Sequence, residues 1–271
     1  MLDGIPVTSA RDTLAGPGQS ALRSPAMNTA SALVERLQHY VPLQPDERDA
    51  LDWLERGRRR FAAHDVIIRE GETSDRLYVV RSGWLHASTL LRNGDRQILR
   101  LHFPGDLMGT SSVAWGRTSA TITAVTDCVI SDFPRAQLGR LFKTQGRLAA
   151  LLYATFSAES VAMSDRLKSL GRTDAKSRIA TLLLEILSRL RVTDPAITNR
   201  FELNLTQADI GDATGLTKVH VNRTLKEMDG SGLIQRQGRT VTILDEPAMI
   251  DLADFKDRLG DIATDWFPPY G

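Results

Sequence analysis

Residues 205–234 read LTQADIGDATGLTKVHVNRTLKEMDGSGLI, and this stretch decides how the C-terminal part of the chain folds. Thr206 followed three residues later by Asp209 is a pairing that caps the start of a helix. Gly215 supplies a left-handed turn after that helix, and Thr217 caps a second one. A small residue four positions before this glycine, and an apolar β-branched residue six positions after it, complete the spacing of a helix-turn-helix.

The inward positions of the two predicted helices carry small or apolar side chains, at Ile210, Gly211, Ala213, Leu216, Val221 and Leu225. Residues 230–243 continue with a glycine-bearing turn and two short β-prone runs, which predict a β-hairpin, or wing, with a basic tip. Residues 175–190 predict a preceding helix, capped by Thr173 or Asp174. The sequence therefore predicts a winged helix-turn-helix.

A winged helix-turn-helix binds double-stranded DNA by placing its second helix in the major groove. The outward residues of that predicted recognition helix are Lys218, Val219, His220, Asn222, Arg223 and Lys226. Asn222 is suited to reading adenine or to binding a phosphate. The other predicted phosphate contacts, which set register rather than sequence, are Thr206, Thr217, Lys226, Arg236 and Arg239.

A long helix is predicted upstream, because residues 135–170 contain no proline and only two glycines, Gly139 and Gly146. Apolar side chains recur there at sums of three and four, at Leu148, Leu152, Phe156, Met163, Leu167 and Leu170. Such a stripe on a long helix between two folded units is typically buried against a symmetric copy. The chain is therefore predicted to form a homodimer.

Strand periodicity replaces helical periodicity between about Arg60 and Leu138. Short β-prone runs cover residues 65–69, 76–81, 84–91, 95–103, 120–126 and 129–133, with turns at Gly71, Gly83, Gly94, Gly105 and Gly116. This spacing predicts an antiparallel roll, sandwich or barrel. Residues 30–57 are helical by pattern, with an apolar side formed by Leu33, Leu37, Leu51 and Leu54.

The turn residues of this β-rich region carry a more specific resemblance. Gly71–Glu72, the run 75–80 and residues 104–109 (PGDLMG) are similar to the cyclic-nucleotide-binding-type β-roll. Residues 101–109 (LHFPGDLMG) look most like the Fnr branch of the Crp/Fnr transcription regulators. Over residues 30–245 the chain resembles that family in the order of its parts. The resemblance implies an α+β fold with a sensor domain at 28–140, a dimerisation helix at 141–171 and a DNA-binding domain at 172–245.

The resemblance also implies a function: a homodimeric regulator that binds a pseudo-palindromic promoter site. RNA polymerase would be a further partner of an activator, whereas a repressor needs only to occlude the promoter. Arg223 aligns with the family arginine that reads guanine, which suits a bidentate contact. Many members have a glutamate at the position of Val219, which can touch only a thymine methyl, so the half-site is expected to differ from the best-known family palindromes.

The residues that resemble the family's effector pocket depart from its pattern. They are Gly109, Thr110, Arg117, Thr118, Ser119, Met163 and Ser164. Thr110 stands where cyclic-AMP-responsive members have a carboxylate for the ribose. Thr118 and Ser119, rather than Arg117, align with the Arg-Ser pair for the phosphate. The leading expectation is a degenerate pocket or an unidentified effector, with a cyclic AMP or cyclic di-GMP response as the alternative.

The cysteine and histidine residues decide which cofactors the chain could use for sensing. The oxygen sensor of the Fnr type needs four cysteines for its cluster, and this chain has only Cys128, in a strand pattern. A thiol switch at Cys128 and haem ligation by His39, His64, His86 or His102 stay open as alternatives, although no histidine pair has ligand spacing. No cofactor and no metal site are predicted.

The composition and the absence of certain motifs in the sequence argue against the other classes of protein. The chain has 271 residues with 34 Lys or Arg against 33 Asp or Glu, no transmembrane run and no catalytic signature motif, so an enzyme is not expected. A cyclic-nucleotide-binding module of another protein is the remaining rival, but such a module needs no recognition helix. Residues 171–245 hold eleven cations and nine anions, five of these cations on the recognition helix and wing. We expect a cytoplasmic, DNA-facing protein without a membrane partner.

The two ends of the chain differ in character. Residues 1–27 are rich in Gly, Ser, Ala and Pro and are expected to be disordered, with translation starting at Met1 or at Met27. The extension 246–271 holds six acidic and two basic residues and ends in Trp266, Phe267 and Tyr270. It is predicted to dock a helix and an aromatic tail on the body.

Overall fold

The computed structural model describes residues 31–260 and 262–268, so the predicted N-terminal arm lies outside the described residues. Two helices come first, α1 (Ala32–Gln38) and α2 (Pro45–Leu54), where the sequence pattern predicted one. The correction has a local cause, because Pro42 and Pro45 disfavour helical geometry in the residues before them. The predicted apolar side of both helices is buried.

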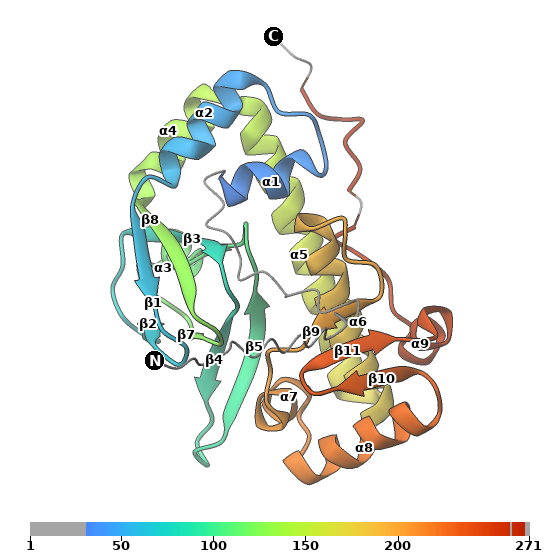
Figure 1. The fold of residues 1–271 in the computed structure, drawn as a ribbon. Coiled ribbons are helices and arrows are strands. Elements are labelled where there is room, and N and C mark those ends of the chain that lie inside the picture. The colour runs from blue at the N-terminus through green and yellow to red at the C-terminus, as the bar shows by residue number, and fades with distance from the viewer. Residues whose placement is uncertain (1–30, 261, 269–271) are drawn as a thin grey trace, which may run out of the picture.

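The predicted antiparallel β-roll is confirmed as two four-stranded sheets in the described chain, with orders β1-β8-β3-β6 and β2-β7-β4-β5 (Figure 1). The strands are β1 (Arg58–Phe61), β2 (Val66–Ile68), β3 (Arg76–Ser82), β4 (Leu85–Leu90), β5 (Arg96–His102), β6 (Leu107–Met108), β7 (Thr121–Ala124) and β8 (Cys128–Pro134). The sequence missed β1, β6 and the short helix α3 (Ser111–Trp115), which are too short to show a period. All five predicted turn glycines have positive φ.

The single helix expected after Pro134 is two helices, α4 (Arg135–Thr144) and α5 (Gly146–Arg172), separated at Gln145. The expected start of the dimerisation helix at residue 141 therefore moves to Gly146. The predicted stripe is also divided. Leu148 and Leu152 are buried in the chain's own core beside α1 and α2, whereas Met163 and Leu167 are exposed by 37% and 64%. Phe156 and Leu170 are half-buried.

The C-terminal unit, residues 175–253, begins with α6 (Ala175–Thr193), which Asp174 caps by accepting from the Ser177 N–H at 2.8 Å. Its other elements are β9 (Arg200–Glu202), α7 (Gln207–Thr214), α8 (Lys218–Gly230), β10 (Ile234–Gln237), β11 (Thr240–Ile243) and α9 (Glu246–Ala253). β9 was not predicted; it pairs with β11 and extends the wing hairpin into a three-stranded sheet of order β10-β11-β9.

The extension after α9 returns along α5 toward α1 (Figure 1). Arg258 Nε donates to Asp165 of α5 at 2.8 Å, and the Tyr40 hydroxyl donates to the Leu259 carbonyl at 2.7 Å. Phe267 packs on the core beside α1 and α2, as the predicted docking of an aromatic tail requires, but Trp266 is 52% exposed. Tyr270 lies outside the described residues. Among the helices that can be described, none is long and apolar enough to cross a membrane.

Candidate nucleic-acid interface

Helix α7 begins where the sequence predicts. The Thr206 hydroxyl accepts from the N–H of Asp209 at 3.1 Å, and the Asp209 carboxylate accepts from the N–H of Thr206 at 2.9 Å. Burial alone would raise the pKa of Asp209, but the hydrogen bonds from Thr206 and the guanidinium of Arg96 lower it overall. This reciprocal cap satisfies two backbone donors and fixes the start of the helix-turn-helix.

The turn between α7 and α8 depends on two glycines. Gly215 has φ +68°, the left-handed conformation that a side chain rarely tolerates. A Cβ at Gly211 would lie 2.5 Å from the carbonyl oxygen of Leu216, two residues before α8 begins. The predicted close approach of the two helices is therefore present, and backbone atoms leave no room for relaxation.

Replacing Gly211 by alanine is expected to lower the free energy of unfolding by about 1–3 kcal/mol, because the added methyl overpacks the turn. The matched control is Gly230→Ala in α8, where nothing lies within 4 Å of the new Cβ. That control is expected to be neutral or to stabilise by up to about 1 kcal/mol. Urea denaturation of both variants measures the difference, and equal stabilities would contradict the assignment of the turn.

The recognition helix α8 presents one exposed face and one buried face. Thr217 caps it by accepting from the His220 N–H at 3.3 Å, and its inward side chains Val221, Thr224, Leu225 and Met228 are buried. Val219 is 80% exposed, and the side chain of Arg223 is 68% exposed and pairs with Glu227 at 3.7 Å. At about 100° per residue, Asn222 and Lys226 lie beside these two, and the exposed Lys218 lies further round the first turn of the helix.

His220 differs from the other predicted contact residues. It is half-buried and lines an open groove together with Thr224, Glu227 and the start of α6 at Lys176 and Arg178. The helical period explains the difference, because positions 220, 224 and 227 share a side that faces α6. His220 therefore lies between this groove and Arg223, which is three residues further along the same helix.

The wing carries one exposed and one half-buried arginine. Gly238 has φ +62° and turns β10 into β11, which exposes Arg239 at the tip, where it donates to the Asn204 side chain at 2.7 Å. Arg236 is half-buried, and its Nε is buried without a hydrogen-bond partner among the described residues. The basic tip predicted from two arginines is thus formed by Arg239, with Arg236 set back on β10.

The residues predicted around the effector pocket make local contacts. Arg117 Nη1 donates to the Gly71 carbonyl at 3.0 Å, and the buried Thr118 hydroxyl donates to the Arg69 carbonyl at 2.5 Å. The Ser119 N–H donates to the Ser111 hydroxyl at 3.1 Å, while Thr110 only begins α3 and Gly109 forms a turn with φ +77°. On α5, Met163 and Ser164 point outward, and the Ser164 hydroxyl donates to the Ser160 carbonyl at 3.1 Å.

These contacts do not fit a cyclic nucleotide held in the family's manner. Such a ligand needs a carboxylate for its ribose, and Thr110 cannot supply one. It also needs a cation for its phosphate, but the guanidinium of Arg117 is already bonded to the backbone of Gly71. The residues aligned with the family pocket therefore lack the ribose carboxylate, and their one guanidinium, that of Arg117, holds a local backbone contact.

The candidate cofactor residues are scattered. His39 donates to the Gly260 carbonyl at 2.9 Å and His64 is exposed, whereas His86 and His102 are buried. Cys128 is buried, and burial, aided by Asp65 and Asp127, raises its pKa to about 11, so the thiol stays protonated. In the part of the chain that the structure describes, no three His, Cys, Asp or Glu side chains are placed to hold a metal ion.

Helix α7 is fixed to the β-roll by a charged contact that the sequence did not predict. Arg96 of β5 donates to Asp209 at 2.5 Å and to Asp212 at 2.7 Å. Its Nη1 also lies 3.3 Å from Nε2 of His86. Burial and the charge of Arg96 lower the pKa of His86 to about 4, although Asp209 and Asp212 oppose this shift. His86 is therefore neutral in the folded protein at neutral pH.

Stability is expected to fall as the pH drops from about 6.5 to about 4. The unfolded chain binds a proton at His86 near pH 6.5, whereas the folded chain resists it until about pH 4, so acid favours unfolding. The loss between pH 7 and pH 5 is about 2 kcal/mol. Urea denaturation at both values measures it, with His86→Asn as the reference. An identical pH dependence in that variant would show that His86 is not responsible.

Comparison with known proteins follows the same division of the chain. Residues 58–145 match the cyclic nucleotide-binding domain family, and residues 177–252 match the Crp-like helix-turn-helix domain family. The chain belongs to the Crp/Fnr family of transcription regulators. It is a DNA-binding regulator rather than an enzyme, as the recognition helix and wing predicted.

This Crp/Fnr regulator is 26% identical to the fumarate and nitrate reduction regulatory protein of Escherichia coli K12, over 84% of this chain and 91% of that protein. It is 27% identical to the transcriptional activator protein FnrA of Stutzerimonas stutzeri, over 79% of this chain and 87% of that protein. The chain is also similar to the solved structure of FixK2 from Bradyrhizobium japonicum, with 28% sequence identity and a TM-score of 0.64. The match covers 72% of this chain and 96% of the FixK2 chain.

Proposed function

We propose that this regulator acts as a homodimer that places one α8 in each half-site of a pseudo-palindromic promoter sequence. The observation that carries the proposal is the outer side of α8, a helix capped at its N-terminus. Val219, Arg223 and Lys226 are exposed there, Asn222 is half-buried beside them, and Lys218 is exposed in the first turn. The N-terminal part of such a helix is the part that reaches base edges. Arg223 reads a guanine, and Val219 contacts a thymine methyl.

The phosphate contacts come from the elements around α8. Lys226 continues the exposed face, Thr217 lies at its start, and Arg239 lies at the wing tip. Thr206 is exposed at the start of α7, where its N–H and hydroxyl already serve the cap. Arg236 is set back and contributes less. These contacts fix the register of the protein on DNA without reading its sequence.

The dimer is formed through the exposed side of α5. Met163 and Leu167 are apolar and exposed, and Tyr153 on the same side is 70% exposed. Leu148 and Leu152 belong to the chain's own core and support the helix from behind. A two-fold axis along α5 would repeat α8 about one helical turn of DNA away, which sets the half-site spacing at roughly 10 base pairs.

The proposed regulator does not use a cyclic nucleotide as its effector. Support comes from the missing ribose carboxylate at Thr110 and from the local bond of Arg117 to the backbone of Gly71. Control then lies in the amount of the protein or in an effector of another kind. Activation would add a contact to RNA polymerase, and repression would need only occupancy of the promoter.

The proposal is tested with the full chain on promoter fragments and on shuffled fragments of the same composition. We expect sequence-selective binding that weakens steeply with salt and does not change when cyclic AMP or cyclic di-GMP is added. Binding to no fragment would contradict the proposed DNA contacts, and binding that needs a cyclic nucleotide would contradict the degenerate pocket.

Lys226→Ala is expected to weaken binding to all fragments by a similar factor and to reduce the salt slope by about one. The reason is that a lysine on the phosphate backbone contributes charge without reading bases. Lys143→Ala is the matched control, because this exposed lysine lies on α4 in the sensor part. Titrations at several salt concentrations measure both slopes. A loss confined to one sequence would instead place Lys226 on a base.

A further inference from the structure

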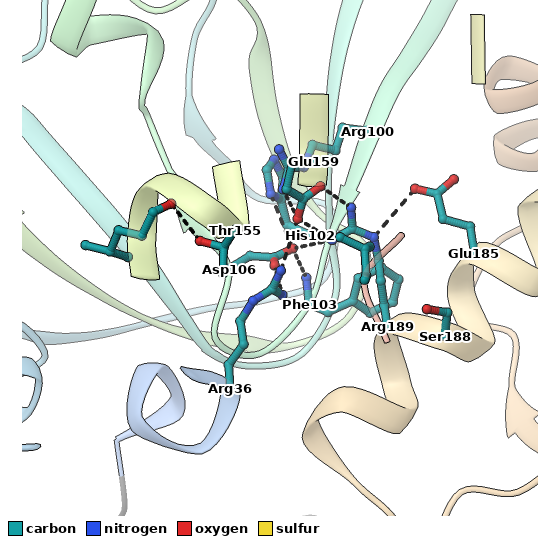
Figure 2. A network of polar contacts seen from close by, with 12 residues as sticks. Arg36, Arg100, His102, Phe103, Asp106, Thr155, Glu159, Glu185, Ser188 and Arg189 are labelled. Carbon is teal, nitrogen blue, oxygen red and sulfur yellow. Dashed lines mark hydrogen bonds and ion pairs between the residues drawn. The ribbon is translucent and has the colours of Figure 1, made fainter. Parts of the chain in front are cut away.

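A cluster of charged side chains is buried where the β-roll, α5 and the C-terminal unit meet (Figure 2). Its two carboxylates are Asp106, in the turn after β5, and Glu159, in the middle of α5, with side chains 1% and 9% exposed. Arg36 comes from α1 and Arg100 from β5. We call these four residues the carboxylate socket.

Within the carboxylate socket both carboxylates already have a cationic partner. Glu159 Oε1 accepts from Arg36 Nη2 at 3.0 Å and lies 2.8 Å from Arg100 Nη2. Asp106 pairs with Arg36 and accepts from the Phe103 N–H at 3.0 Å. Two negative and two positive groups therefore balance in the socket.

Arg189 enters this socket from α6 of the C-terminal unit, and its side chain is 2% exposed. Its guanidinium makes a bidentate contact with Glu159, in which Nη2 donates to Oε2 at 2.6 Å and Nη1 donates to Oε1 at 3.1 Å. Nη1 also donates to the Asp106 carboxylate at 3.4 Å. Burial alone would raise the pKa of both carboxyls. The charges of Arg36 and Arg189 instead hold the pKa of Asp106 below its usual range, and the charges of Arg189 and Arg100 do the same for Glu159. The planar fork of arginine fixes direction as well as distance.

The helix that carries Arg189, α6, also packs against the recognition helix α8. Ile179, Leu183 and Leu187 of α6 share a core with Val221, Leu225 and Met228 of α8. The position of α6 on the socket therefore sets the position of α8 relative to α5, which carries the proposed dimer axis.

We propose that Arg189 is a positioning residue, which docks α6 in the carboxylate socket and thereby fixes the spacing of the two recognition helices in the dimer. This inference rests on the proposed function of the chain as a dimeric DNA-binding regulator. Removal of one partner from a buried ion pair is usually costly because a charge is left alone. Here Arg189→Met leaves Asp106 and Glu159 paired with Arg36 and Arg100, so the variant is expected to fold.

The test compares Arg189→Met with Arg191→Met, its matched control. Arg191 lies two residues further along α6 and pairs with Glu246 inside the C-terminal unit, at 2.7 Å. Both full-length variants are titrated on a palindromic operator, selected with the unmodified protein, and on a single half-site. We expect Arg189→Met to lose about tenfold or more on the palindrome and less than about twofold on the half-site, with Arg191→Met unchanged on both.

Hydrogen exchange on the full chain without DNA supplies a second measurement. In Arg189→Met, amides of α7 beside β5, where Gln97 donates to the Asp212 carbonyl at 2.6 Å, are expected to exchange faster than in the unmodified protein. If Arg189→Met does not fold, Arg189→Lys keeps the charge without the two-pronged contact and is expected to show the same palindrome-specific loss.

Unchanged palindrome affinity in a folded Arg189 variant would overturn the inference, and so would an equal loss on the half-site. An unmodified protein that binds no DNA would contradict the proposed function instead. In that case the exchange measurement alone decides the inference, and unchanged α7 exchange in the variant would overturn it.

Discussion

Replacement of Leu167 by glutamate is expected to convert the proposed dimer into a monomer and to lower affinity for a palindromic site by more than about 100-fold. Leu167 is 64% exposed on the side of α5 that also carries Met163. In a two-fold interface the substitution places two unpaired carboxylates where apolar surface should meet. A monomer can still engage one half-site, but it loses the linked second contact.

Sedimentation and DNA titration of the same preparation measure this result. Phe142→Glu is the matched control, because Phe142 is an exposed apolar residue of α4 that lies outside the stripe on α5. It is expected to leave both the mass in solution and the affinity unchanged. A Leu167→Glu protein that still sediments as a dimer would show that another surface joins the two copies.

Replacement of Arg223 by alanine is expected to cost about 1–3 kcal/mol of binding free energy at the selected operator and to relax the preference at one base position in each half-site. The guanidinium is 68% exposed and its ion-pair partner among the described residues is Glu227, at 3.7 Å, so it is available for a bidentate contact to guanine. Titration of single-base operator variants measures the change in preference.

Glu227→Ala distinguishes the proposed base contact of Arg223 from its ion pair with Glu227. It removes the weak pair on α8 and leaves the arginine in place, so it is expected to keep the base preference. If Arg223→Ala retains both the affinity and the preference of the unmodified protein, the arginine is not a base contact and the recognition face of α8 has been assigned wrongly.

The helix-turn-helix could be predicted from the sequence because its signals are local. Thr206, Asp209, Gly215 and Thr217 act within a few residues of their own positions, and the structure confirms each of these roles. The β-roll was predicted for a similar reason, since its strands alternate and its turns contain glycine. The misplaced start of the long helix shows the limit, because nothing in the apolar stripe marks the separation of α4 from α5 at Gln145.

The carboxylate socket could not be predicted from sequence patterns. Arg36 and Asp106 are 70 residues apart, and Arg36 and Glu159 are 123 residues apart, so no spacing or period connects them. Only the packing of α1, β5, α5 and α6 brings these charges together. The division of the dimer stripe has the same cause, because Leu148 and Leu152 are covered by helices from the start of the chain.

Selection of bound DNA from a random pool tests the central claim most directly. The full chain is predicted to enrich a pseudo-palindrome whose half-sites are about one helical turn apart, with a guanine in each half that Arg223→Ala no longer selects. Enrichment of unpaired single sites, or no enrichment over the starting pool, would contradict the account of a dimer that reads DNA through α8.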